Sequence, residues 1–343
     1  MQSLQSESGV ATIATFIAEQ SGASKVEVAN LRRLAGGSSR QVWSLDAVVN
    51  SDRLELVLRI DPTAGPSAEQ VSRSSGFNGE FELLRAAHAI GVPVPRPYWW
   101  CGDTELLGGP FYLMERVEGE SIARRIFRSE ELESAREKLP AQLGTALAKV
   151  HEIDVGTDEL AWLPAPLAGR SSPETQLEQL RIALDLAPSP TPVGEWAYRW
   201  LAQHLPDERA RTLVHGDFRI GNVIVGPEGL RSVLDWELAH VGDPHEDLAW
   251  MCTKTWRFGN VDRPVGGVGP REPFYAAYEA ASGRKLDRDL LHYWETLSSL
   301  KVLSVWIIQM RSYLTGILPS VEQAAIGRRM AETELDLLEL LGD

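Results

Sequence analysis

The hydrophobic pattern of this 343-residue chain changes character near residue 118, and no other feature constrains the fold as strongly. Before that point, apolar residues form short or alternating runs bounded by Gly, Pro, Asn and Ser, which is typical of β-strands. After it, apolar residues recur every three or four positions, which is typical of amphipathic helices. The sequence therefore predicts an α+β chain: an N-terminal helix within 1–25, a β-rich part at 26–118 and a larger α-helical part at 119–343.

The same patterns predict individual elements. In the β-rich part, strands are expected over 26–35, 41–49, 54–60, 98–101 and 110–117. The Ser-, Gly- and Pro-rich stretch 61–78 is expected to be a loop, followed by a helix over 79–90. The helical part should contain short strands at 211–214, 222–225 and 232–234 and helices at 139–153, 174–184, 195–204, 247–254, 273–281, 287–314 and 320–341. Pro140 is expected in the first turn of its helix, where proline costs no hydrogen bond.

Composition excludes several classes of partner. The chain carries 34 Lys and Arg against 48 Asp and Glu, a net charge of −14. A general nucleic-acid binder or a polybasic membrane-surface protein needs a basic face, so no nucleic acid and no membrane are expected as partners. The sequence has no apolar run of about 18 residues that could span a membrane. Cys101 and Cys252 lack metal-site spacing and are expected to be buried. A cytoplasmic protein is the expectation.

One polar loop, flanked on both sides by strand-like apolar residues, carries the side chains suited to chemistry. Residues 215–222 read HGDFRIGN, and Asp235 follows at the end of a further apolar run. Phosphoryl transfer needs an acceptor hydroxyl to be positioned and phosphate charge to be neutralised. Asp217 can accept the hydroxyl proton, and the oxygens of Asn222 and Asp235 are the hard ligands that Mg²⁺ prefers. The spacing therefore favours a phosphotransferase.

The pattern HGDxxxxN followed by LDWE resembles the aminoglycoside phosphotransferase superfamily. The longer run LDWELAHVGDPHEDLAW at 234–250 most closely resembles the branch that includes phosphotransferase domains fused to acyl-CoA dehydrogenases. The resemblance implies a protein-kinase-like two-lobe fold, with a small β-rich nucleotide-binding N-lobe at 26–118 and a larger α-helical C-lobe at 119–343. It also implies ATP and Mg²⁺ as cofactors.

The resemblance assigns roles in the catalytic loop. Asp217 should orient or deprotonate the acceptor hydroxyl, while Asn222 and Asp235 should hold Mg²⁺. Arg219 is expected near the transferring phosphate, where it could clamp two oxygens. The alternative is that Arg219 points outward and pairs with a surface carboxylate. Asp247 is interpreted as a helix N-cap or as an anchor for the backbone of the loop.

In the N-lobe, the resemblance points to a cation on the third strand and a glutamate on the following helix. Arg59 stands where the family often has Lys and can hold the α/β-phosphates bidentately. Glu80 is expected to pair with Arg59. Its neighbour Glu82 projects about 200° away around the helix, so only one of them can face inward.

Two further nucleotide contacts are expected from position alone. Gly37, Ser38 and Ser39 lie in a turn between two strands, where a loop that covers the phosphates is expected; an ordinary hairpin loop is equally compatible with the sequence. Glu115 and Val117 fall at the junction of the lobes, where such folds bind adenine through backbone groups.

Two further features of the sequence are an apolar tryptophan and a group of cations. Trp250 is expected in the core. The stretch 254–271 places Lys254, Arg257, Arg263 and Arg271 in an otherwise acidic chain. Two interpretations stay open for these cations: solvated surface charge, or a site for an anionic group of the acceptor.

The expected function is ATP- and Mg²⁺-dependent phosphorylation of a hydroxyl on a small molecule. The acceptor class stays open among aminoglycosides, hydroxy acids and hydroxyacyl-CoA compounds. A catalytically silent nucleotide- or ligand-binding module is the alternative, because Arg59 replaces the usual Lys. A metal-dependent hydrolase is disfavoured, since His240 and His245 lie in a turn without the spacing of metal ligands.

Overall fold

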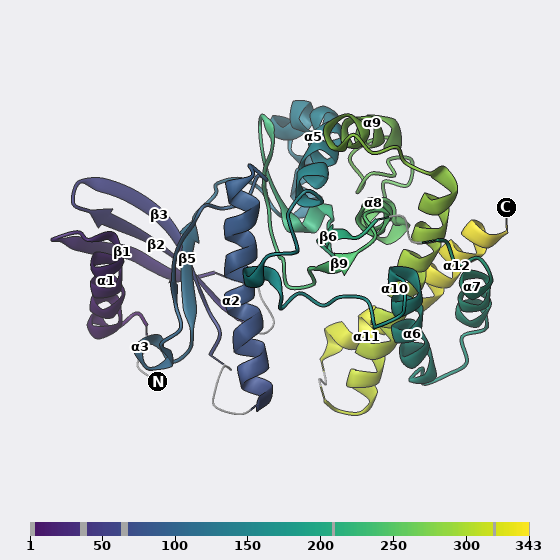
Figure 1. The fold of residues 1–343 in the computed structure, drawn as a ribbon, viewed down its shortest axis with the longest axis horizontal. Helices are drawn as coiled ribbons and strands as arrows, with labels where there is room; N and C mark the ends of the chain where they lie inside the picture. Colours follow the sequence, from purple (N-terminus) through teal and green to yellow (C-terminus); the bar gives the residue numbers. More distant parts are fainter. Residues whose placement is uncertain (1–3, 35–39, 63–67, 208–209, 318–319, 343) are drawn as a thin grey trace. The chain divides into compact units, whose positions relative to one another are not determined.

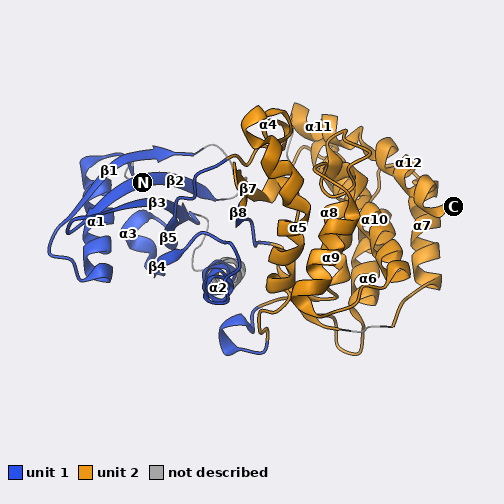
Figure 2. Ribbon diagram, turned by 90° about the horizontal axis from the view of Figure 1, so that it is seen from above, with its two compact units in different colours: residues 1–119, 156–162, 231–237 blue, residues 120–155, 163–230, 238–343 orange. Residues whose placement is uncertain are grey.

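The computed structural model of the chain describes residues 4–34, 40–62, 68–207, 210–317 and 320–342. The chain divides into two compact units, drawn in blue and orange in Figure 2. The first unit contains residues 1–119, 156–162 and 231–237, and the second contains 120–155, 163–230 and 238–343. The first unit is β-rich and the second is mainly helical, so the predicted α+β class is confirmed.

The first unit is built on a five-stranded antiparallel sheet with the order β1-β2-β3-β5-β4 (Figure 1). Its strands are β1 (Val26–Arg33), β2 (Gln41–Val49), β3 (Asp52–Ile60), β4 (Pro97–Cys101) and β5 (Phe111–Glu115). Its helices are α1 (Glu7–Ser21), α2 (Ala68–Ala89) and the single turn α3 (Thr104–Leu107).

Side chains on the strands of this sheet alternate between its two faces, as the pleat requires. Phe111 and Leu113 of β5 share one buried cluster with Ile13 of α1. Tyr112, between them, belongs to another cluster with Phe77 of α2. The two helices therefore pack against opposite faces, and any residue on the Tyr112 face of the sheet is directed toward α2.

The second unit is organised around α10 (Arg288–Leu314), the longest helix in the described part of the chain. Its Trp294, Leu297 and Leu300 are fully buried in one large cluster with residues of α6, α7 and α12. The other helices of this unit are α4 (Ala123–Arg128), α5 (Glu133–Val150), α6 (Ser172–Asp185), α7 (Pro192–Gln203), α8 (His245–Cys252), α9 (Arg271–Ser282), α11 (Val321–Gly327) and α12 (Met330–Leu341).

Short strands and 3₁₀ turns frame the polar loop of the second unit. β6 (Thr212–Val214) pairs with β9 (His240–Gly242), so His240 lies opposite Val214. The remaining short elements are β7 (Val223–Gly226), β8 (Gly229–Val233), η1 (Glu130–Leu132), η2 (Asp158–Leu160), η3 (Ile220–Asn222) and η4 (Lys254–Arg257).

The predicted loop over 61–78 is wrong from residue 68 onward, because α2 begins at Ala68. The fully buried Phe77 explains the longer helix. Its ring centroid lies 5.0 Å from that of Tyr112 and 5.5 Å from that of Trp100. Packing of this ring against the sheet overrides the weak helix propensity of the Ser- and Gly-rich segment.

Two helix boundaries also differ from the prediction. α5 starts at Glu133, so Pro140 lies inside the helix instead of in its first turn. The buried stripe of α5 begins at Ala135 and continues through Leu139, which extends the helix toward the N-terminus. The single helix predicted over 320–341 is two helices, α11 and α12, with a break between Gly327 and Met330.

Two expectations about individual features can be compared directly with the structure. Cys101 and Cys252 are both buried free thiols, as predicted. None of the helices in the described ranges combines the length and the apolar character needed to cross a bilayer.

At Gly144, α5 lies close against the backbone of α9. A Cβ atom built there would lie 2.2 Å from the carbonyl oxygen of Phe274 in α9. We predict that Gly144→Ala lowers the free energy of unfolding, because overpacking costs about 1–3 kcal/mol and exceeds the roughly 1 kcal/mol that Ala gains over Gly in a helix. Urea denaturation measures the change.

Gly76 provides the matched control for that substitution. It is also helical, in α2, but a Cβ built there meets nothing within 4 Å. Gly76→Ala should therefore leave stability unchanged or raise it slightly. If Gly144→Ala were as stable as Gly76→Ala, the close packing of α5 on α9 would be contradicted.

Candidate active site

The polar loop between β6 and β7 turns sharply at Gly216. Gly216 has φ +81°, and a Cβ atom at this position would lie 2.3 Å from the carbonyl oxygen of Leu238. Only glycine combines the left-handed backbone with so close a contact. The turn delivers Asp217 directly after it, with a partly buried side chain.

Three donors on three residues hold the carboxylate of Asp217. Arg219 Nε donates to Oδ1 at 2.9 Å and to Oδ2 at 3.0 Å. Asn222 Nδ2 donates to Oδ2 at 2.6 Å and to the main-chain carbonyl of Asp217 at 3.0 Å. Trp250 Nε1 donates to Oδ1 at 2.8 Å. The sequence-predicted residues Asp217, Arg219 and Asn222 are thus brought together, and the orientation of the carboxylate is fixed.

Trp250 was expected in the core alone, and it has a second contact that the prediction missed. It is buried with Val302 and Trp306, which confirms the core interpretation. Its indole N–H can only donate, and it does so to Asp217. A buried tryptophan normally finds an acceptor for this N–H group. The sequence therefore indicates that Trp250 has an acceptor, but it does not indicate which residue provides it.

Among the described residues, Arg219 forms its ion pair with Asp217 and with no separate surface carboxylate. Beyond its contact with Asp217, its guanidinium lies 4.8 Å above the ring of Trp256, which itself packs against Trp250 with centroids 5.2 Å apart. The ring of Trp256 supports the guanidinium from one face.

Asp247 anchors the backbone of the loop, as one of its two interpretations proposed. Its Oδ2 accepts from the N–H of His215 at 2.7 Å and its Oδ1 from the N–H of Gly216 at 2.9 Å. His151 lies 3.1 Å from Oδ2 through Nε2, and its Nδ1 lies 2.8 Å from the hydroxyl of Tyr278. A neutral His151 that donates through Nε2 and accepts at Nδ1 satisfies both contacts.

The charges of this buried network are set by its contacts. Burial lowers the pKa of His151 and keeps the ring neutral, although Asp247 acts in the opposite direction. Burial acts to raise the pKa of Asp247, but the hydrogen bond from His151 and those from the backbone outweigh it and hold the pKa below its ordinary value. The anchor is therefore an ionised carboxylate.

A second group of predicted residues lies in the first unit. Arg59 of β3 faces α2, and its Nη1 forms an ion pair with Glu80 Oε1, as expected. Tyr112 joins the pair, with its hydroxyl 3.0 Å from both groups. Arg40 binds the other oxygen of Glu80, a contact that sequence reasoning missed. Glu82 pairs with Arg85 instead, so Glu80 is the inward glutamate.

Asp235 belongs to the same unit as Arg59. Its backbone has φ +66°, a left-handed conformation that Asp tolerates better than most residues. Burial opposes the charge of Arg59, but Tyr112, Glu80 and Asp235 together outweigh it and raise the pKa of Arg59. Asp235 is thus electrostatically coupled to the cation of β3.

The other predicted nucleotide contacts are only partly described. Gly37, Ser38 and Ser39 lie outside the described residues. Glu115 is the last residue of β5, and its backbone N–H donates to the carbonyl oxygen of Arg96. Val117 is half-buried just beyond the strand.

The histidines that a hydrolase would use are occupied by other contacts. His240 Nε2 lies 3.1 Å from Glu246, and His245 Nδ1 lies 2.7 Å from Asp243.

The predicted site residues are divided between the two units. The second unit contains Asp217, Arg219 and Asn222, and the first contains Arg59, Glu80 and Asp235.

We predict that the His151 network makes stability fall in mild acid. Burial lowers the folded-state pKa of His151 below its ordinary value of 6.5. As the pH falls, the unfolded chain therefore takes up a proton on this ring at a higher pH than the folded chain does. Stability should therefore decrease as the pH falls through 6.5 toward the lower pKa of the folded state. His151→Gln, which cannot titrate, should lose less stability over this range, although it is less stable than the wild type at neutral pH.

Urea midpoints of both proteins across this range measure the effect. Other titrating groups are common to the two proteins, so the difference isolates His151. Equal acid sensitivity in His151→Gln and the wild type would show that the network does not keep this ring neutral.

The chain matches the model of the phosphotransferase enzyme family over residues 30–292. Among curated proteins, it is 35% identical to mouse acyl-CoA dehydrogenase family member 10 over 213 residues, which cover 58% of this chain and 18% of that protein. It is 30% identical to acyl-CoA dehydrogenase family member 11 of Pongo abelii over 303 residues, which cover 82% of this chain and 37% of that protein. The chain thus spans well under half the length of these relatives.

Solved structures share the fold. A Ralstonia eutropha protein described as an aminoglycoside phosphotransferase aligns with a TM-score of 0.75 and 22% identity, covering 96% of this chain and 97% of that one. A thermostable mutant of another aminoglycoside phosphotransferase, in ternary complex with AMP-PNP and hygromycin B, aligns with a TM-score of 0.58 and 17% identity over 95% and 98% of the two chains. These likenesses confirm the kinase-like fold. Since the family model covers more than half of the sequence, the chain belongs to the phosphotransferase enzyme family.

Proposed function

We propose that the protein is an ATP- and Mg²⁺-dependent kinase that phosphorylates a hydroxyl group of a small molecule. The observation that carries the proposal is the carboxylate of Asp217, which follows a backbone turn anchored by Asp247 and is oriented by three donors. Phosphoryl transfer depends mainly on positioning and on electrostatic stabilisation. A fixed carboxylate beside a cation and an amide suits that chemistry.

Asp217 is proposed to receive the proton of the acceptor hydroxyl. As the acceptor oxygen bonds to the γ-phosphorus, the bond from that phosphorus to the β–γ bridging oxygen breaks, and ADP leaves. Arg219 uses Nε to hold Asp217. Its terminal nitrogens project beyond that contact and are proposed to stabilise the transferring oxygens.

Asn222 and Asp235 are proposed to hold Mg²⁺. The donor set fits, because amide and carboxylate oxygens are hard ligands. The amide nitrogen of Asn222 is used by Asp217, so the amide oxygen is the atom proposed to bind the metal. When bound, the metal would neutralise charge on the phosphates.

The first unit is proposed to bind the nucleotide. Arg59, held by Glu80 and Tyr112, is assigned to the α/β-phosphates. The backbone groups of Glu115 and Val117 are assigned to adenine. The turn with Gly37, Ser38 and Ser39 is assigned to covering the phosphates. The complex of a structurally similar phosphotransferase with AMP-PNP supports nucleotide use.

Asp217→Asn tests the function directly. ATP consumption and phosphorylated product should be measured against aminoglycosides, hydroxy acids and hydroxyacyl-CoA thioesters, the last because of the names of the curated relatives. With an accepted substrate, Asp217→Asn should lower turnover by about 10²–10⁴-fold, because proton acceptance acts in the transition state, and the KM for ATP should change little. Asp262→Asn, which removes an exposed carboxylate, serves as control. Near-normal turnover of Asp217→Asn would sink the assignment.

Asp235→Asn tests the metal site. Asn tolerates the positive φ of this position, so the substitution removes charge with little backbone strain. The Mg²⁺ concentration for half-maximal activity should rise by about tenfold or more, and ATP affinity should fall with it. Asp262→Asn, which removes an exposed carboxylate elsewhere in the chain, should leave the Mg²⁺ titration unchanged. An unchanged titration in Asp235→Asn would place the metal elsewhere.

The competing proposal is a catalytically silent nucleotide-binding module. The contacts of Arg59 support this alternative. Its Nη1 is already engaged by Glu80 and Tyr112, and Arg40 adds a second cation to Glu80. Such a module would bind ATP without forming a phosphorylated product from any acceptor. Turnover that depends on Asp217 would exclude it.

A further inference from the structure

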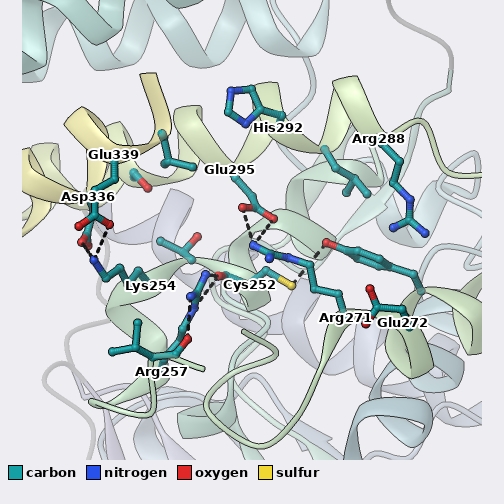
Figure 3. A pocket seen from close by; sticks show the side chains of 16 residues that line it. Cys252, Lys254, Arg257, Arg271, Glu272, Arg288, His292, Glu295, Asp336 and Glu339 are labelled. Atoms are coloured by element: carbon teal, nitrogen blue, oxygen red, sulfur yellow. Dashed lines mark hydrogen bonds and ion pairs between the residues drawn. The ribbon is translucent and has the colours of Figure 1, made fainter. Parts of the chain in front are cut away.

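A cavity of about 630 Å³ lies in the second unit among η4, α9, α10 and α12 (Figure 3). Neither Asp217 nor any of the three residues that hold its carboxylate lines it. The cavity is therefore distinct from the candidate active site. Its lining is rich in charge, with cations at Lys254, Arg257, Arg271 and Arg288 and carboxylates at Glu272, Glu295, Asp336 and Glu339.

Two of the cations are neutralised within the cavity. Lys254 Nζ lies 3.0 Å from Asp336 and 2.8 Å from Glu339. Arg271 Nη2 donates to both oxygens of Glu295, at 2.9 and 2.8 Å. Figure 3 shows these pairs on the walls formed by α12 and α10. Three of the four carboxylates, Asp336, Glu339 and Glu295, are thus paired with cations.

Arg257 differs from these cations, because no ion pair joins it to a carboxylate within the described ranges. Its Nε and Nη2 donate to the carbonyl of Cys252 at 3.2 and 2.8 Å, and its Nη1 donates to the carbonyl of Val261 at 3.1 Å. A guanidinium has five N–H groups. The carbonyls take three, so one N–H on each terminal nitrogen remains for a ligand.

The electrostatic surroundings of Arg257 are unfavourable for a lone cation. Burial, and after it the neighbouring Arg271, lower the pKa of Arg257, and the smaller opposing effects of Glu295 and Asp336 do not offset them. An arginine nevertheless stays protonated in proteins. A partly buried charge that no carboxylate contacts in an ion pair is costly, and an anion that binds it recovers part of that cost.

We propose that this cavity is a binding site for a small molecule that carries a carboxylate or phosphate group, with the oxyanion held by the two remaining N–H groups of Arg257. The paired N–H groups of a guanidinium match the paired oxygens of such an anion. The charges of Arg271 and of the exposed Arg288 reinforce the attraction. The proposal is independent of the proposed kinase activity.

For the cations of this stretch the sequence leaves two interpretations open, solvated surface charge or a site for an anionic group of the acceptor, and the structure separates the cations. Lys254, Arg257 and Arg271 line the cavity, whereas Arg263 is exposed and does not. Trp256, on the same 3₁₀ turn, packs instead against Trp250 and under Arg219. The turn η4 thus presents cations to the cavity and an indole to the residues around Asp217.

Isothermal titration calorimetry of the full chain with inorganic phosphate and, separately, with succinate tests the proposal. The wild type should bind at least one of the two anions, and the stronger binder shows whether phosphate or carboxylate is preferred. Arg257→Met should weaken that binding by about tenfold or more, as expected for loss of a hydrogen-bonded charge. Arg263→Met removes the same charge from the same loop outside the cavity and should bind within about twofold of the wild type.

A second variant covers the case in which Arg257→Met fails to fold. Val261 is half-exposed and lines the cavity, so Val261→Glu should be tolerated and should place a competing carboxylate beside Arg257. It should abolish anion binding, whereas Val305→Glu, which adds the same charge at an exposed position outside the cavity, should bind like the wild type. Two outcomes would overturn the proposal: no binding of either anion by the wild type, or equal binding by the wild type, Arg257→Met and Val261→Glu.

Discussion

The buried carboxylate of Asp247 is the interaction on which the candidate catalytic loop depends. It accepts the N–H groups of two successive residues, His215 and Gly216, at a turn where no strand or helix could satisfy them. Trp250, one turn further along α8, donates to the side chain of Asp217. Residues three apart share a face of a helix. One helix therefore fixes both the backbone before Asp217 and the direction of its carboxylate.

The first unit positions its cation by a different constraint, the alternation of side chains along a strand. Leu58 and Ile60 of β3 are buried in the cluster with α1, which leaves Arg59 on the face toward α2. A shift of one residue in register would bury the guanidinium among the apolar residues of the α1 side. The hydrophobic pattern of β3 thus directs Arg59 toward α2, where Glu80 pairs with it.

Spacing and periodicity predicted most of the strands and the grouping of Asp217 with Asn222, whereas the pairing of Arg59 with Glu80 was expected from the family resemblance. The rest depended on tertiary contacts without a local signal. α2 begins earlier than its composition suggests, because Phe77 finds Tyr112 and Trp100. Arg40 lies 40 residues from Glu80, and nothing in its neighbourhood indicates the pairing. The return of residues 231–237 to the first unit likewise follows from long-range contacts.

Three arginines withdrawn from the surface of this acidic chain show how the surroundings of a cation separate structural from ligand-binding roles. Arg59 has a buried carboxylate as partner, and Arg219 has the carboxylate of Asp217; both are held in place by charge. Arg257 is held by carbonyl oxygens, which fix its position, and no ion pair joins it to a carboxylate among the described residues. A carbonyl dipole neutralises a full charge less completely than a carboxylate does. In a chain with net charge −14, where carboxylates are abundant, a cation held in this way is the one best suited to an external anion.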